Sequence, residues 1–145
     1  QAAMRDGLLR GILWHQGESD ASAEETASSY NQRLTKMVGD LRKQLGAPTA
    51  PFIAGELGRF LKPVTKTGEP SYWPTVNEQI NLLPGSLPHA AVVSSEGLNH
   101  KGDDVHFDTP ALEELGRRYA QALQRLQQAA APSANESREE VPPRP

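Results

Sequence analysis

Short apolar runs alternate with longer amphipathic segments along this chain of 145 residues. Three runs, at residues 8–14, 51–57 and 89–94, are the right length for strands and too short for helices. A run without polar alternation is typical of a strand that is buried on both faces. The pattern therefore predicts three buried strands.

Apolar residues between the first two strands recur at spacings of three and four, which predicts an amphipathic helix. Ser22 and Glu25 have the spacing of a capping box at its start, and Gly46 and Pro48 stop it. Its predicted buried stripe consists of Ala27, Tyr30, Leu34, Met37, Leu41 and Leu45.

Two further helices are predicted downstream. Pro74 opens the first, and the pair Pro84-Gly85 ends it. The last helix begins at Thr109 and Pro110. Residues 58–72 form a long irregular connection, of a kind that is usually functional or mobile.

Strands that alternate with helices predict the α/β class, with a parallel sheet and helices on both sides. Three strands are few for such a fold, residues 2–5 resemble the end of a helix, and position 1 is not Met. We therefore expect the N-terminal part of the fold to be missing. We expect residues 1–128 to form a partial domain, and residues 129–145, rich in Pro, Ala and charge, to form a disordered tail.

The composition argues against several classes of binding partner and of chemistry. The net charge of −3 gives no general attraction to nucleic acid or to an anionic membrane, and no apolar run approaches the ~18 residues of a membrane span. Cysteine is absent, which excludes disulfides and thiolate chemistry. We expect no cofactor and no metal, since the histidines and aspartates of residues 100–106 lack a recognised ligand spacing. The pattern predicts neither an oligomeric state nor a cellular location.

Two polar clusters follow the first and third strands, at the sheet edge where open parallel sheets carry their sites. One reads HQGESD and the other GLNHKGDDVHFD. In the second, Asp103 and His106 are three residues apart, so the carboxylate can fold back onto one imidazole nitrogen. The other nitrogen is then free to act as a base. Taken alone, this spacing is more often a helix cap beside a surface histidine.

Together, WHQGESD, GELG and KGDDVHFD followed by ELGRRYAQAL resemble the SGNH-hydrolase superfamily. The branch they resemble more closely is that of the sialate O-acetylesterases and acetylxylan esterases, carbohydrate esterase family six. The resemblance runs from about Leu8 to Leu123. It implies a flavodoxin-like three-layer α/β/α sandwich. It also implies a serine esterase that removes O-acetyl groups from sugars or polysaccharides, with an acetylated carbohydrate as substrate.

The same resemblance implies roles for individual residues. His106 becomes the catalytic base and Asp103 its acidic partner. Gln16 becomes a donor to the oxyanion, Gly17 allows close backbone approach, and Glu18 braces the loop. The family's Gly-Gln-Ser nucleophile block has no counterpart here, so we expect no nucleophile in this chain.

Two other hypotheses remain. Ser19, in the stretch GESDA, could be the nucleophile of an α/β-hydrolase, although we expect it, or Ser22, to cap the following helix instead. Alternatively, the chain is a non-catalytic sugar-binding or interaction module, in which Phe60, Tyr72 and Trp73 stack on sugars. Packing of these aromatic side chains beneath the long loop is the competing explanation.

Charged residues on the last helix are expected to be structural. Its Glu113-Glu114 and Arg117-Arg118 pairs have the spacing of solvated ion pairs on an outer face. They do not predict a surface for nucleic acid.

Overall fold

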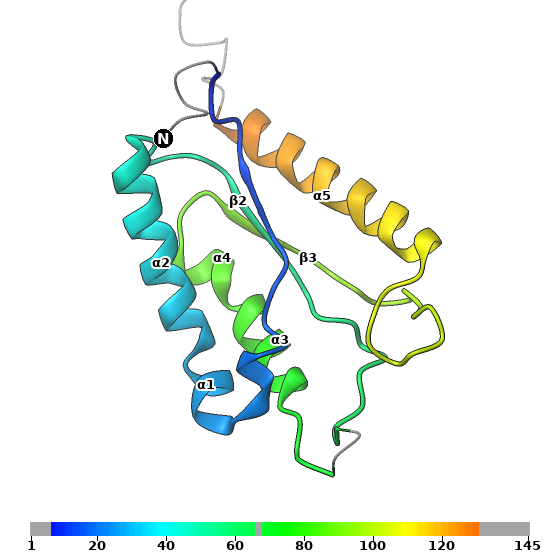
Figure 1. Ribbon diagram of the computed structural model, residues 1–145. Helices are drawn as coiled ribbons and strands as arrows, with labels where there is room; N and C mark the ends of the chain where they lie inside the picture. The colour runs from blue at the N-terminus through cyan, green and yellow to red at the C-terminus, as the bar shows by residue number, and fades with distance from the viewer. Residues whose placement is uncertain (1–6, 66–67, 131–145) are drawn as a thin grey trace, which may run out of the picture.

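The computed structural model describes residues 7–65 and 68–130, which form three layers (Figure 1). The middle layer is a parallel sheet of β1 (Ile12–Trp14), β2 (Phe52–Gly55) and β3 (Ala90–Val93), in that order. In register, Phe52 pairs with both Ile12 and Ala90. The predicted class, a flavodoxin-like α/β/α sandwich with a parallel sheet, is confirmed.

Helices cover the two faces of the sheet unequally. One face packs against the 3₁₀ turn η2 (Asp20–Ser22) and four helices, α1 (Glu24–Ser28), α2 (Tyr30–Leu45), α3 (Trp73–Asn81) and α4 (Leu83–Ser86). The other face packs against α5 (Thr109–Ala129). Alternate residues of β2 serve the two layers, because Phe52 and Ala54 join the first core and Ile53 joins the second.

The start of the first predicted helix differs from expectation. The segment breaks at Ser29 into α1 and α2, and Ala23 is the N-cap of α1 without a side-chain cap. The predicted capping box is therefore wrong. The Ser22 hydroxyl instead donates to the carbonyl of Ser19 at 2.7 Å, and Glu25 accepts the Ser29 hydroxyl through its backbone oxygen.

The buried stripe of α2 also differs. Tyr30 and Leu34 are buried as predicted, but Val38 and Arg42 continue the inward face in place of Leu41 and Leu45. The stripe follows the i, i+4 rows counted from the new start at Tyr30. A buried Arg42 is tolerated there because its guanidinium donates to three carbonyl oxygens, those of Ala50, Pro88 and His89.

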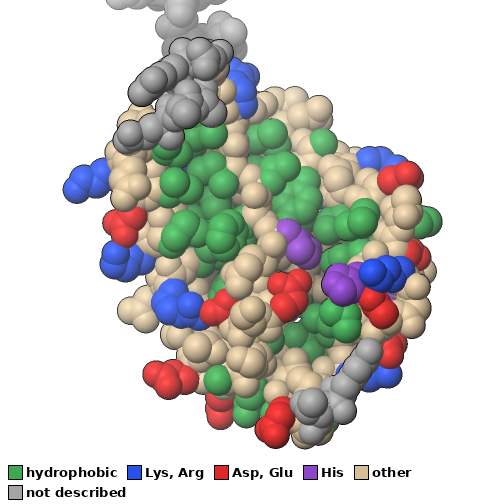
Figure 2. Space-filling view, viewed as in Figure 1, with side chains coloured by type: hydrophobic (Ala, Val, Ile, Leu, Met, Phe, Trp, Pro, Cys, Tyr) green, Lys and Arg blue, Asp and Glu red, His purple; other side chains and the backbone are tan. Residues whose placement is uncertain are grey.

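The first strand is shorter and less buried than predicted. Only Ile12–Trp14 pairs with β2, and within the described residues the outer edge of β1 has no partner strand. Helix α5 packs over β2 and β3, so Leu13 is left 57% exposed. In Figure 2, hydrophobic side chains gather on the face where β1 lies, with histidine side chains beside them.

Some boundaries also shift. The turn at Pro84-Gly85 does not end a helix but lies inside the short α4, where proline in the first turn costs no hydrogen bond. Helix α5 extends to Ala129, one residue into the predicted tail. The rest of that tail, residues 131–145, and the helix end predicted at residues 2–5 lie outside the described residues. Within the described ranges, no helix has the length and apolarity to cross a membrane.

Candidate active site

The two polar clusters and the end of β2 meet at one edge of the sheet, the carboxyl edge of its three parallel strands. The loop after β3 reaches across β2 to the end of β1. There the ring of Phe107 packs edge-on against His15, with centroids 5.6 Å apart. Phe60, from the loop after β2, packs against both Phe107 and His100. Residues from all three strand ends therefore share one site.

The loop after β1 is fixed by packing at Gly17 and by hydrogen bonds at Gln16. Gly17 is buried at φ +149°, and a Cβ there would lie 2.8 Å from Val76, so only glycine fits. The Gln16 side-chain nitrogen donates to Asp20 at 2.8 Å, while the Tyr30 hydroxyl donates to the backbone carbonyl of Gln16 at 2.6 Å and lies farther, at 3.0 Å, from the side-chain oxygen. The contact with Asp20 fixes which way the amide faces, and its other N–H has no hydrogen-bond partner among the described residues.

Asp20 is the carboxylate that supports this loop. Burial opposes its ionisation, but hydrogen bonds from Gln16 and Arg33 outweigh that effect and lower the pKa of Asp20. Glu18, which was expected to brace the loop, is exposed and forms no hydrogen bond or ion pair with another described residue. The bracing role of Glu18 therefore stays a prediction.

Asp103 and His106 make the contact that their spacing suggests. Asp103 Oδ2 lies 2.7 Å from His106 Nδ1, while Oδ1 accepts the backbone N–H groups of His106 and Val105. The pKa of Asp103 is held well below its usual range. The largest cause is the hydrogen bond from the backbone N–H of His106, followed by the bond to the His106 ring and the one from the backbone N–H of Val105. The His106 side chain is 66% exposed. Its Nε2 therefore faces outward, as a general base requires.

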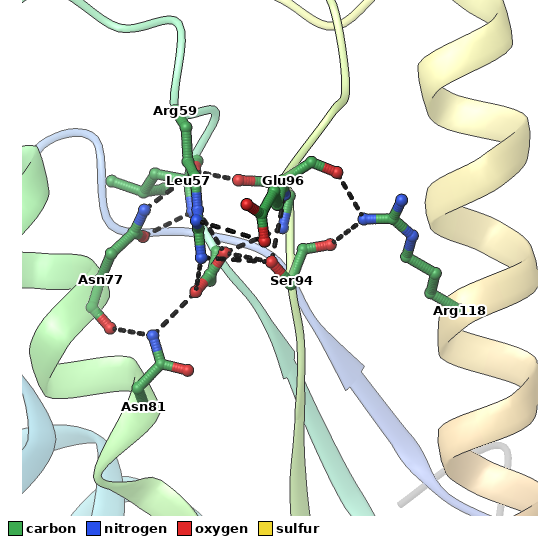
Figure 3. Close-up of polar contacts among 9 residues, drawn as sticks. Leu57, Arg59, Asn77, Asn81, Ser94, Glu96 and Arg118 are labelled. Atoms are coloured by element: carbon green, nitrogen blue, oxygen red, sulfur yellow. Dashed lines mark hydrogen bonds and ion pairs between the residues drawn. The ribbon is translucent and has the colours of Figure 1, made fainter.

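Glu56, which lies in the stretch GELG, was given no role in the sequence analysis, but several of its partners meet at the ends of β2 and β3, among them Arg59, Asn81 and Ser94, which are labelled in Figure 3. Its side chain is 2% exposed and accepts hydrogen bonds from Arg59, Asn81, Ser94 and the backbone of Ser95. Burial opposes ionisation, but these donors lower the pKa of Glu56 to about 2. The carboxylate thus joins the ends of β2 and β3 to α3.

Hydrogen bonds from α5 also hold the start of the loop that carries Asp103 and His106. Arg118 of α5 donates to the carbonyl oxygens of Ser94, at 2.7 Å, and Glu96, at 3.0 Å (Figure 3). Its partner in the helix is Glu114, as predicted. The expectation that this arginine is merely solvated is wrong, because the loop passes within its reach.

The alternative sites are less well formed. Ser19 is exposed, its side chain caps nothing, and it forms no hydrogen bond with His106 among the described residues. The prediction that its hydroxyl caps a helix is therefore wrong. Tyr72 and Trp73 pack against the core of the α1–α4 layer, which favours the packing explanation for these aromatic side chains. In residues 7–65 and 68–130, no cluster of three His, Asp or Glu side chains suits a metal ion.

The chain is similar to known carbohydrate esterases. The family model for carbohydrate esterase, sialic acid-specific acetylesterase, matches residues 1–125. A probable carbohydrate esterase of Arabidopsis thaliana is 32% identical over 116 residues, which cover 80% of this chain and 40% of the relative.

Two solved structures have a similar fold. A crystal structure of a protein from Arabidopsis thaliana has a TM-score of 0.71 at 28% identity, over 86% of this chain and 48% of that one. A carbohydrate acetylesterase from Xanthomonas citri has a TM-score of 0.70 at 21% identity, over 87% and 28%. The chain thus spans less than half the length of these proteins. By the family match over residues 1–125, it belongs to the carbohydrate esterase family of sialic acid-specific acetylesterases.

Proposed function

We propose that this chain supplies the base, its acidic partner and an oxyanion donor of a serine esterase that removes O-acetyl groups from sugars or polysaccharides. The observation that carries the proposal is the contact between His106 Nδ1 and Asp103 Oδ2, 2.7 Å long, on a loop that packs against the end of β1. Family membership and the names of the relatives support an acetylated carbohydrate as the substrate.

His106 and Asp103 divide the proton chemistry between them. As a serine hydroxyl attacks the acetyl carbonyl, His106 Nε2 takes the hydroxyl proton, and it later returns this proton to the leaving sugar oxygen. Asp103 keeps the proton of the neutral ring on Nδ1 and stabilises the imidazolium that forms. Its lowered pKa supports this role, since the carboxylate remains ionised throughout.

Gln16 stabilises the charge that develops on the carbonyl oxygen. Asp20 accepts one N–H of the amide, and Tyr30 donates to the backbone carbonyl of the same residue. The second N–H can therefore donate to the oxyanion without reorganisation, which is the condition for strong transition-state stabilisation. Gly17 allows the loop to pack closely against Leu57 and Val76, and this packing positions the neighbouring side-chain amide of Gln16.

The nucleophile belongs to a segment outside these 145 residues. Among the described residues no histidine forms a hydrogen bond with Ser19, and the chain spans only 40% of a curated relative. The unpaired edge of β1 offers a place for a further strand next to Gln16. A serine at the carboxyl end of such a strand would lie beside the oxyanion donor.

The dyad can be tested in a longer protein that contains this chain together with its nucleophile segment. Acetate release from acetylated sugars is measured for His106→Ala, Asp103→Ala and the double variant. Each single change should lower kcat/KM by several orders of magnitude. The double variant should lose little more than His106→Ala, because the two groups act as one unit. Independent, multiplying losses would contradict the assignment.

The position of the nucleophile can be tested on the 145-residue chain itself. We expect no labelling by a fluorophosphonate probe, and no acetyl-ester hydrolysis, because no described serine hydroxyl forms a hydrogen bond with a histidine. The longer protein should be labelled on its own serine. Mass spectrometry decides the matter, since an adduct on the peptide that contains Ser19 would show that the nucleophile lies in this chain and that the α/β-hydrolase hypothesis is correct.

A further inference from the structure

His15 is a second histidine at the site, and the dyad mechanism does not use it. It ends the run from β1, directly before Gln16, and its ring packs against Phe107, the neighbour of His106. Nδ1 lies 3.3 Å from the Tyr119 hydroxyl. A Cβ on Gly55 would lie 2.7 Å from that nitrogen, so the glycine is what allows the ring to reach Tyr119.

The Tyr119 hydroxyl determines which nitrogen of His15 carries the proton. A phenol has one proton to donate, and at 2.6 Å the carbonyl of Trp14 is much nearer than the imidazole. Tyr119 can therefore only accept from His15, which requires a proton on Nδ1. In the neutral ring Nε2 then carries a lone pair, and no described residue donates to it.

The imidazole ring of His15 is neutral at neutral pH. Its packed surroundings lower the pKa of His15, against a smaller opposing effect of the Glu18 carboxylate. The residue as a whole is exposed. With Nδ1 turned to Tyr119, Nε2 is the ring nitrogen left to accept a hydrogen bond from outside the described residues, on a side chain that lies between the proposed oxyanion donor and the loop of His106.

We propose that His15 Nε2 accepts a hydrogen bond from a free hydroxyl of the sugar, next to the acetylated oxygen. The acetylated oxygen has no proton to give, so the donor must be a neighbouring hydroxyl. His15 thereby selects partly acetylated sugars that keep a vicinal hydroxyl. This inference rests on the proposed function, because it assumes that an acetylated sugar binds at this sheet edge.

Two esters separate recognition from chemistry in the longer protein. A singly acetylated methyl pyranoside with a vicinal hydroxyl has the donor, and 4-nitrophenyl acetate has none. His15→Asn keeps a donor for Tyr119 but has no group at the position of Nε2. It should lower kcat/KM for the sugar ester about tenfold, the usual size of one lost hydrogen bond, and leave the aryl ester within about twofold. His89→Asn, at the opposite end of β3, should change neither.

The outcomes distinguish the two proposals. Equal losses on both esters, or no loss on the sugar ester, overturn the role of His15 but leave the esterase proposal intact. A wild-type protein that hydrolyses neither ester overturns the proposed function and this inference with it.

The tautomer can be measured on the 145-residue chain without any activity. In ¹⁵N NMR of histidine-labelled protein, assigned with His15→Asn, the Nε2 of His15 should show the shift of an unprotonated nitrogen at neutral pH. Tyr119→Phe should remove this preference, since the acceptor for Nδ1–H is gone. A protonated Nε2 in the wild type would overturn the inference.

Discussion

Replacing Glu56 with Gln should destabilise the fold more than any change of an exposed charge nearby. The Glu56 carboxylate accepts five hydrogen bonds, from Arg59, Asn81, Ser94 and Ser95. The amide of a glutamine has one oxygen and one NH₂ group, so in either orientation its N–H groups face some of these donors and leave them without an acceptor. Because the carboxylate is buried, we expect the free energy of unfolding at pH 7 to fall by about 1–3 kcal/mol, the usual cost of a buried donor left without its acceptor.

The pH dependence gives an independent magnitude. Folding lowers the pKa of Glu56 from 4.5 to about 2, and each pKa unit corresponds to about 1.4 kcal/mol. The carboxylate therefore contributes about 3 kcal/mol that is fully present above pH 4.5 and is lost as the pH falls towards 2. Glu56→Gln has no such group. The stability difference between the two proteins should therefore shrink over that range.

Urea unfolding followed by tryptophan fluorescence, between pH 7 and pH 3, measures both effects. The matched control is Glu96→Gln, because Glu96 pairs with the same Arg59, at 3.6 Å, but is 77% exposed. This control should change stability by only a few tenths of a kcal/mol. A loss below about 1 kcal/mol for Glu56→Gln, or a difference that does not depend on pH, would refute the account of Glu56 as an ionised, buried anchor.

Two further changes test the loop after β1. Gly17→Ala should lower the free energy of unfolding by about 1–3 kcal/mol, because a side chain is strained at this φ and its Cβ meets Val76. The control is Gly39→Ala, whose Cβ meets nothing. Equal thermal midpoints for the two variants would contradict this prediction. Gln16→Ala should lower turnover of an acetyl ester in the longer protein by roughly 10²–10³, and full turnover would remove Gln16 from the oxyanion hole.

The sequence predicted the parts of the fold that local patterns encode. The three strands follow from short apolar runs, and α5 follows from Thr109-Pro110. The contact of Asp103 with His106 was predictable for the same reason, since both lie in one turn. Its catalytic role stays a prediction. The cap that the structure adds to α5, Asp108, whose side chain accepts from the N–H of Ala111, was not among the predictions.

Glu56 shows what local patterns miss. Its partners Asn81, Ser94 and Ser95 are 25 to 39 positions away, so no spacing in the sequence marks them as a group. Arg118 was misjudged in a related way, because its helical spacing to Glu114 is visible but the carbonyl oxygens that it clamps are not. The break at Ser29 was also missed, because no glycine or proline marks it in the sequence.

The unpaired edge of β1 has a consequence for the behaviour of this polypeptide in solution. Open backbone N–H and C=O groups beside an exposed Leu13 form a template for any strand of matching direction, including that of another copy. The edge carries no proline at Ile12–Trp14 to block such pairing. Because no strand covers this edge within the described residues, we expect the 145-residue chain to self-associate increasingly as its concentration rises, and a strand paired beside Leu13 would prevent that contact.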